Sequence, residues 1–184
     1  MRSAFRRLKK TIMNTFKELF LAPKFGTIPD GLKELPYGVW IAEPRKNKPG
    51  KFDKAPRSPK TGFNISTSKP DLWGTFDQAV AAYEAGGYTG VGVLLTGDGL
   101  IGVDIDDVDQ IFADRPEVKA WVHDAIKADA YCEASPSGTG LRLFMRGDPL
   151  PDTVMRKHGH LEIYDNVRFL TVTGHLVRKA GDHA

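Results

Sequence analysis

Apolar and polar residues recur along this chain with two different periods. In residues 2–21 apolar side chains return every three or four positions, with Arg and Lys between them, which predicts an amphipathic basic helix. Elsewhere, short runs rich in Val, Ile, Leu and aromatic residues predict strands, and these runs are 37–43, 90–95, 100–105, 131–134, 141–144 and 160–174. A turn signal at Asp165-Asn166 divides the last run into two strands.

Two more segments have the pattern of helices. Thr75 is typical of an N-cap, and the helix that it begins would end at Gly86 and Gly87. Residues 109–130 predict a further helical segment, in which Pro116 marks a break or a helix start. We interpret both segments as scaffold, because their polar residues have the arrangement of a solvated surface.

Residues 96–99, Thr-Gly-Asp-Gly, connect two of the predicted strands. Asp-Gly in a short loop between β-rich runs is a hairpin signal, so we expect strands 90–95 and 100–105 to pair with each other. Residues 23–36 and 44–68 are rich in Pro, Gly and charged residues, which indicates loops. A loop as long as 44–68 is either functional or without a fixed structure.

Composition narrows the setting in which the protein works. The chain has 184 residues, 41% of them hydrophobic, which suits one compact domain with a good core. Because Cys132 is the sole cysteine, an intramolecular disulfide and a multi-cysteine zinc site are excluded, and we expect a reducing, cytoplasmic setting. No apolar run has the length of a membrane span and no signal-peptide pattern is present, so we expect a soluble protein without a membrane role.

Charge is distributed unequally. Residues 1–60 carry 15 Lys and Arg against 5 Asp and Glu, whereas residues 61–184 carry 11 against 18. A basic first part beside an acidic centre suits an enzyme that holds a polyanion by its backbone and carries out metal chemistry elsewhere, although a solvated basic tail has the same composition. The basic segment 2–21 fits a helix docked on the domain, an arm that touches nucleic acid or membrane, or an organellar presequence.

The segment Val-Asp-Ile-Asp-Asp at 103–107 is the first candidate for chemistry. Alternate side chains of a strand share one face, so Asp104 and Asp106 would project together, with their Cα atoms about 7 Å apart. Two neighbouring carboxylates repel each other unless a cation lies between them, which favours a divalent-metal site over an acidic strand end in solvent. Glu162 stands between apolar neighbours and is either a paired, partly buried carboxylate or a third metal ligand.

The turn Ser-Pro-Ser-Gly-Thr-Gly at 135–140 is the second candidate. Its glycines allow the backbone to approach a ligand, and its N–H groups can form a nest for an anion such as phosphate. The spacing excludes a P-loop and a dinucleotide-binding fingerprint, and a plain turn is the alternative. The basic loop that precedes it in the chain could also hold phosphates, through Lys51, Lys54 and Arg57.

Other metal sites do not fit the spacing of the candidate ligands. His158 and His160 lie far from Cys132 in the sequence and lack a zinc-ligand spacing. A calcium-binding loop that begins at Asp104 fails as well, because it would place Arg115 where a bidentate Glu is required.

Several motifs, taken in order, resemble the archaeo-eukaryotic primase superfamily. They are DID at 104–106, SGTGLR at 137–142, LEIY at 161–164 and RFLTVTG at 168–174, preceded by KAPRSPKTG at 54–62 and PDLWGTFDQA at 70–79. The order and spacing are most similar to the primase-polymerase domains of phage and plasmid replication proteins, over residues 37–178. The resemblance implies an α+β catalytic domain at 37–184, after an N-terminal basic helix and linker at 1–36. It also implies an RRM-like antiparallel sheet flanked by helices, with a smaller N-terminal α/β portion.

For the site, the resemblance implies template-dependent nucleotidyl transfer in DNA replication with two Mg²⁺ or Mn²⁺ ions. The residues implied as metal ligands are Asp104, Asp106 and Glu162, and those implied to hold the triphosphate of a dNTP or NTP are Ser137, Gly138, Thr139, Arg142 and Arg168. Single-stranded or primed DNA would be bound by Lys51, Lys54 and Arg57, and a helicase in the same or another chain is a further expected partner. For Arg168, a structural salt bridge explains the residue as well. Tyr164 either lies against the nucleotide sugar or is a core or surface tyrosine.

One residue departs from the superfamily pattern, because Arg142 stands where a histidine is usual. Arginine keeps a permanent charge and a bidentate fork, so it can still hold a triphosphate. Two rival functions follow from this departure and from the clustered carboxylates. They are a nucleotide- or DNA-binding replication module with weak or no catalysis, and a two-metal nuclease or phosphoesterase.

Overall fold

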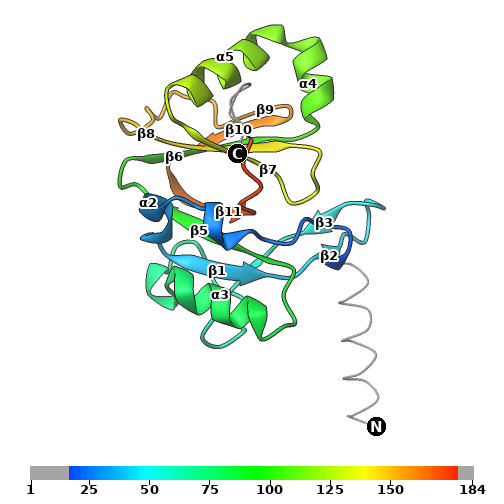
Figure 1. Cartoon of the computed structure of the whole chain (residues 1–184), viewed down its shortest axis with the longest axis vertical. Coiled ribbons are helices and arrows are strands. Elements are labelled where there is room, and N and C mark those ends of the chain that lie inside the picture. The colour runs from blue at the N-terminus through cyan, green and yellow to red at the C-terminus, as the bar shows by residue number, and fades with distance from the viewer. Residues whose placement is uncertain (1–16, 178–184) are drawn as a thin grey trace.

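The structure is a computed structural model that describes residues 17–177. Most of the predicted basic helix 2–21 and the residues 178–184 lie outside the described residues. Figure 1 shows the described part in four layers: helices α4 (Val108–Asp114) and α5 (Pro116–Lys127), two sheets, and helix α3 (Phe76–Glu84). The chain is therefore an α+β protein with antiparallel sheets, as the sequence predicts.

The sheet that lies next to α3 has four strands, and all its pairs are antiparallel. In order across the sheet they are β11 (Asn166–Val172), β5 (Gly90–Thr96), β1 (Tyr37–Trp40) and β4 (Pro56–Arg57). Helix α3 packs on β1 and β5. Thr75 begins the helix through a capping box with Gln78, which confirms the predicted N-cap.

The other sheet has five antiparallel strands with β6 at its centre. In order across the sheet they are β7 (Tyr131–Ala134), β8 (Leu141–Arg146), β6 (Leu100–Ile105), β10 (Leu161–Tyr164) and β9 (Lys157–His158). Helices α4 and α5 connect β6 to β7, and Pro116 is the first residue of α5, as the sequence predicts for a helix start. The connection from β6 through these helices to β7 and β8 is a split β-α-β arrangement.

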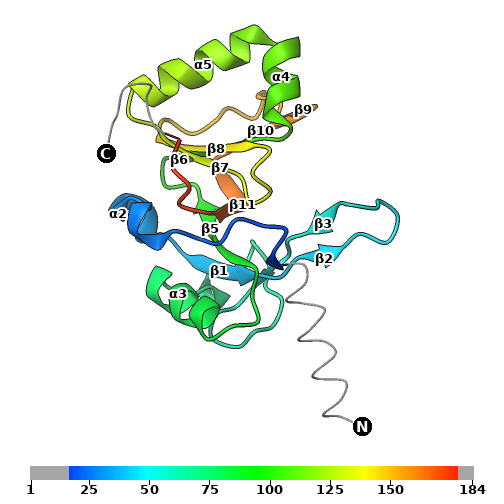
Figure 2. The same ribbon diagram turned by 45° about the vertical axis from the view of Figure 1, so that its right-hand side comes forward.

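A hairpin of β2 (Glu43–Pro44) and β3 (Phe52–Asp53) stands apart from both sheets, and Figure 2 shows it extending from one side of the body. Short helical turns occupy η1 (Phe25–Thr27), α2 (Asp30–Lys33) and η2 (Pro70–Leu72). Leu32 on α2 and its flanking residues Ile28 and Leu35 are buried in the same core as the strands next to α3.

Two apolar clusters follow from the alternation of side chains along β6. Ile101, Val103 and Ile105 point to the face that α4 and α5 cover, together with Val118 and Val122. The other face meets the four-stranded sheet through a second cluster, whose members include Leu100, Phe144, Val93 and Leu170. Gly102 leaves room for the side chain of Leu170 from the other sheet, because a Cβ atom at this position would lie 2.3 Å from Leu170 Cδ1.

The predicted hairpin between strands 90–95 and 100–105 is wrong. Both strands form, but β5 lies in the four-stranded sheet and β6 in the five-stranded sheet, so residues 96–99 cross from one sheet to the other. The physical reason is that β5 has a partner on each of its edges, namely β1 and β11, and offers no edge to β6.

The expected smaller N-terminal α/β portion is not a continuous segment of the chain. Its sheet contains β11, which comes from the far end of the described residues and pairs with β5 over most of its length. The segment Lys24–Thr27 adds to this arrangement, because the Lys24 N–H donates to Thr173 O. The first and last described parts of the chain therefore complete one layer together.

Candidate active site

A row of charged residues crosses the five-stranded sheet on the face that meets the other sheet. Glu162 on β10 lies directly opposite Asp104 on β6, which in turn lies opposite Arg142 on β8. The row is extended by Lys157 on β9, opposite Glu162, and by Glu133 on β7, opposite Arg142. Directly opposed residues of antiparallel strands share a face, so the sheet brings together residues from five separate stretches of sequence.

Asp104 and Arg142 form a buried ion pair at the centre of this row. Arg142 Nη2 donates to Asp104 Oδ2 at 2.9 Å. Only 5% of the Arg142 side chain and 14% of the Asp104 side chain are exposed. Within the described residues, Asp104 Oδ1 and the Arg142 Nε and Nη1 groups are buried without a hydrogen-bond partner. Buried polar groups are normally paired, so the unpaired oxygen suits a cation and the unpaired N–H groups suit an anion.

Glu162 is held by three side chains. Lys157 Nζ donates to Oε1, Arg168 NH2 donates to Oε2 at 2.6 Å, and the Tyr164 hydroxyl donates to Oε2 at 3.0 Å. Arg168, on β11, also lies over the Tyr164 ring, 4.2 Å from its centroid. Arg168 therefore reaches from the four-stranded sheet to a carboxylate of the five-stranded sheet.

The Gly-rich turn lies against the end of β6, next to Asp106. A Cβ atom on Gly140 would lie 2.3 Å from Ile105 O, so only glycine fits this approach without a shift. The turn is closed by Gly138, whose φ is +76°, and by hydroxyl contacts of Ser137 with Ser135 at 3.1 Å and with Thr139 at 3.0 Å. The Asp106 side chain is exposed, on the side of β6 that Asp104 occupies.

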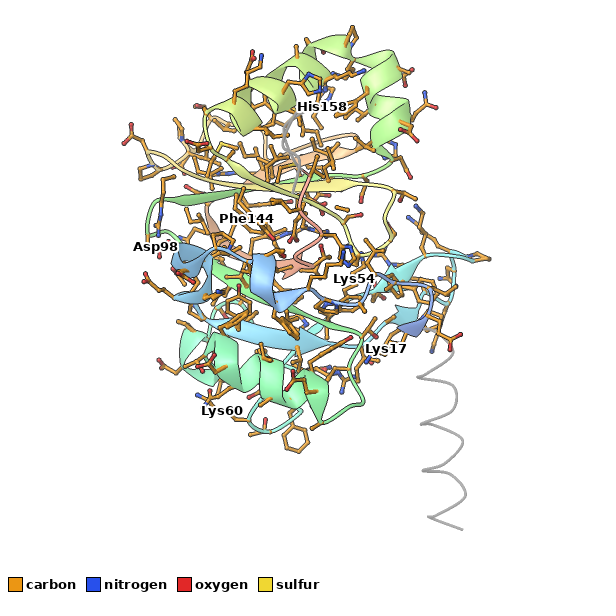
Figure 3. The ribbon with its side chains drawn as sticks, viewed as in Figure 1. Lys17, Lys54, Lys60, Asp98, Phe144 and His158 are labelled. Carbon is orange, nitrogen blue, oxygen red and sulfur yellow. The ribbon has the colours of Figure 1, made fainter. Side chains whose placement is uncertain are left out.

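Lys54 lies within electrostatic reach of the same groups. Its Nζ is 5.8 Å from the Phe20 ring centroid and 5.9 Å from that of Trp40. Burial lowers the pKa of Lys54 to about 8; the charge of Arg142 lowers it as well, and the charges of Asp104 and Asp106 oppose the change. Figure 3 shows Lys54 where the β2–β3 hairpin meets the body, whereas Lys60 lies at the α3 end and Asp98 on the other edge.

The remaining basic candidates are less central. Lys51 is exposed at the base of the hairpin loop, next to β3. Arg57, on β4, forms an ion pair with Glu43 at 2.5 Å and donates to Gly62 O. Arg57 is thus engaged with its own surroundings, while Lys51 projects toward solvent.

Sequence reasoning missed two members of the row, Glu133 and Lys157. Glu133 is completely buried and accepts hydrogen bonds from the backbone N–H groups of Thr173 and Gly174 and from the Tyr131 hydroxyl. A Glu in an apolar strand is the signal that could have marked it, as it marked Glu162. Lys157 gives no comparable signal, because exposed lysines are common.

The described residues contain no group of three or more His, Cys, Asp or Glu side chains arranged to hold a metal ion. Asp104 and Glu162 face each other, but both carboxylates are engaged by cationic side chains. Of the three candidate ligands, Asp106 is the exposed one, and Asp104 keeps one unpaired oxygen. Across residues 17–177, no helix is both long and apolar enough to pass through a bilayer.

Comparison with known proteins found one informative similarity. A protein of Nitratiruptor phage NrS-1 named DNA primase-polymerase is 34% identical to this chain over 146 residues, which is 75% of this chain and 19% of that protein. The chain thus spans about a fifth of the length of this relative. No protein-family model matches the chain.

Proposed function

We propose that this chain is a template-dependent primase-polymerase domain that transfers nucleotides to a DNA or RNA 3′ end during the replication of a phage or plasmid. The observation that carries the proposal is the charged row, in which Asp104 and Glu162 face each other beside Asp106 and the Gly-rich turn. The similarity to the phage DNA primase-polymerase supports the same reaction class.

Asp104, Asp106 and Glu162 would hold two Mg²⁺ or Mn²⁺ ions, because carboxylate oxygens are the ligands that both metals prefer. When bound, such ions lower the pKa of an attacking 3′-hydroxyl and neutralise a leaving pyrophosphate. In the described arrangement Lys157 and Arg168 neutralise Glu162, and Arg142 neutralises Asp104. These side chains act as internal counter-charges until the carboxylates receive a metal.

The nucleotide triphosphate would lie on the Gly-rich turn and against two arginines. Ser137 and Thr139 offer hydroxyls and backbone N–H groups, and Gly138, whose own N–H donates to Ser135 O, shapes the turn between them. Arg142 offers its Nε and Nη1 nitrogens, which have no partner among the described residues. Arg168 carries an unpaired buried Nε–H as well. Tyr164 lies beside both Glu162 and Arg168, which places its ring close to a nucleotide held there.

DNA would approach from the hairpin side. Lys54 lies near two aromatic rings and within electrostatic reach of Asp104 and Asp106. Lys51 stands at the hairpin with the exposed Lys46 and Lys48. A row of cations on a projecting hairpin binds the phosphate backbone without reading its sequence. Arg57 would serve this surface only after release from Glu43. We also propose a helicase, in the same or another chain, as a partner of this domain.

A second candidate function, a nucleotide-binding module without catalysis, is favoured by the buried pair between Arg142 and Asp104. That pair keeps a candidate metal ligand engaged. A nuclease with two metal ions would use the same carboxylates, and these three functions differ in what they do to DNA.

The test is extension of a labelled primer on a longer template with Mn²⁺ or Mg²⁺ and dNTPs. We expect extension by the natural chain and by the control Asp98→Ala, an exposed aspartate on the opposite edge, and none by Asp106→Ala. Undiminished extension by Asp106→Ala would overturn the metal assignment. Cleavage of the labelled DNA without dNTPs would support the nuclease, and nucleotide binding without extension would support the binding module.

A further inference from the structure

Glu133 is the charged member of the row that the proposed reaction leaves without a role. It lies on β7, directly opposite Arg142, and Asp104 lies directly opposite Arg142 on the other side. Arg142 therefore stands between two acidic residues on one face of the sheet, on strands that lie about 5 Å to either side of β8. Only Asp104 forms a direct hydrogen bond with it.

Both oxygens of the Glu133 side chain accept hydrogen bonds, which favours its ionised form. All three groups that contact it are donors: the N–H groups of Thr173 and Gly174, at 2.9 and 2.7 Å, and the Tyr131 hydroxyl, at 2.8 Å. The two backbone N–H groups can only donate, so each Glu133 oxygen acts as an acceptor, whereas the Tyr131 hydroxyl can donate or accept. Burial raises the pKa of Glu133, and the three donors and the charge of Arg142 oppose that rise.

Arg142 is thus attracted by two carboxylates that differ in how completely other groups occupy their oxygens. Glu133 is completely buried and anchored to the backbone after β11, whereas Asp104 keeps an unpaired oxygen. A metal ion at Asp104 would compete with Arg142 for that carboxylate. The stronger the counter-charge that Glu133 supplies, the less free energy the release of Asp104 costs.

We propose that Glu133 is a positioning residue that acts through Arg142: its carboxylate balances the guanidinium charge and so makes Asp104 available to a divalent metal ion. This inference depends on the metal site of the proposed function, but it does not depend on polymerisation. Glu133 would thus control the affinity of the site for its metal ion, although it is buried and would not contact the substrate.

The test measures Mn²⁺ binding directly, by calorimetry or electron paramagnetic resonance of the full chain without nucleotide or DNA. Glu133→Gln removes the charge and keeps the shape, and we expect the Mn²⁺ dissociation constant to rise about 10-fold or more, as for other outer-shell residues of metal sites. The matched control is Asp165→Asn, a buried carboxylate whose partners are Arg156 and the Leu150 N–H. We expect that variant to bind Mn²⁺ like the natural chain.

A double-mutant cycle separates the action through Arg142 from general damage to the fold. In the background of Arg142→Gln, the change Glu133→Gln should weaken Mn²⁺ binding much less, because the competing guanidinium is gone. Equal weakening in both backgrounds, or an unchanged dissociation constant in a folded Glu133→Gln chain, would overturn the proposal. Tyr131→Phe removes one hydrogen bond from Glu133 but keeps its charge, so a loss as large as that of Glu133→Gln would also count against it.

Three further outcomes have defined consequences for the proposal and for the proposed function. Should Glu133→Gln not fold, Arg142→Gln alone decides: it should tighten Mn²⁺ binding, and weaker binding would refute the competition. If the natural chain binds Mn²⁺ and the double-mutant cycle shows the expected coupling, but no primer is extended, the inference holds and the proposed polymerase function is refuted. If the natural chain binds no Mn²⁺ at all, both the metal assignment and the inference fail.

Discussion

Loss of charge at Asp104 should destabilise the protein, whereas the same change at Asp106 should not. Asp104→Asn removes the negative charge that directly balances the Arg142 guanidinium, whose side chain is only 5% exposed. Breaking a buried pair from one side costs about 3 to 5 kcal/mol, and Glu133 on the other side of Arg142 offsets part of the loss. We therefore expect the lower end, about 3 kcal/mol, which in a domain of this size lowers Tm by about 6 to 12 °C.

The measurement is thermal unfolding followed by circular dichroism, in buffer free of divalent metal ions. Asp106→Asn, whose side chain is exposed, should stay within about 0.5 kcal/mol of the natural chain. Adding Arg142→Gln to Asp104→Asn should restore part of the stability, because no unpaired buried charge remains. Equal Tm values for the two single variants would refute the reasoning. Since both variants should fail in primer extension, Asp106→Asn is the cleaner test of catalysis.

Three further changes have defined outcomes. Because the pKa of Lys54 falls from 10.5 to about 8 on folding, the unfolded chain binds the extra proton between these values, and stability rises with pH through this window. Lys54→Met should lack that rise and be more stable at pH 7 by at most about 3 kcal/mol, as urea unfolding at pH 7 and 10.5 can measure. Gly140→Ala places a Cβ atom against Ile105 O, so it should cost about 1 to 3 kcal/mol in urea unfolding and weaken dNTP binding measured by calorimetry. Lys51→Met should reduce the slope of log affinity for single-stranded DNA against log salt by about 1 in fluorescence anisotropy, whereas Lys60→Met should leave it unchanged.

Local sequence signals predicted where helices and strands form better than they predicted which strands pair with each other. Thr75 and Pro116 begin helices as their chemistry requires, and the apolar runs form strands at the expected places. The Asp-Gly signal at 96–99 was misleading because strand pairing depends on distant partners. Both edges of β5 are taken, one of them by β11, more than 70 positions further along the chain.

The candidate site shows the same difference between what local patterns predict and what long-range strand pairing decides. The DID and LEIY motifs lie on the paired strands β6 and β10, and the Gly-rich turn lies against the end of β6. Each motif could be found in the sequence because it places unusual residue types in a recognisable pattern. A glutamate in an apolar strand is a local signal that could have marked Glu133, but its place beside Arg142 depends on the strand register. The hydrogen bonds from Thr173 and Gly174 likewise join residues about 40 positions apart, which no local pattern encodes.

The place of β11 beside β5 determines the order in which this chain can fold. During synthesis β1, β4 and β5 leave the ribosome early, but the sheet that contains them stays open until residues 166–172 arrive. Until then β5 presents a row of unpaired backbone groups along an apolar strand, which is a template for association with other chains. A chain that ends before residue 166 but contains β5 and the Asp104 strand β6 would leave the β5 edge unpaired permanently. Such shortened chains should aggregate.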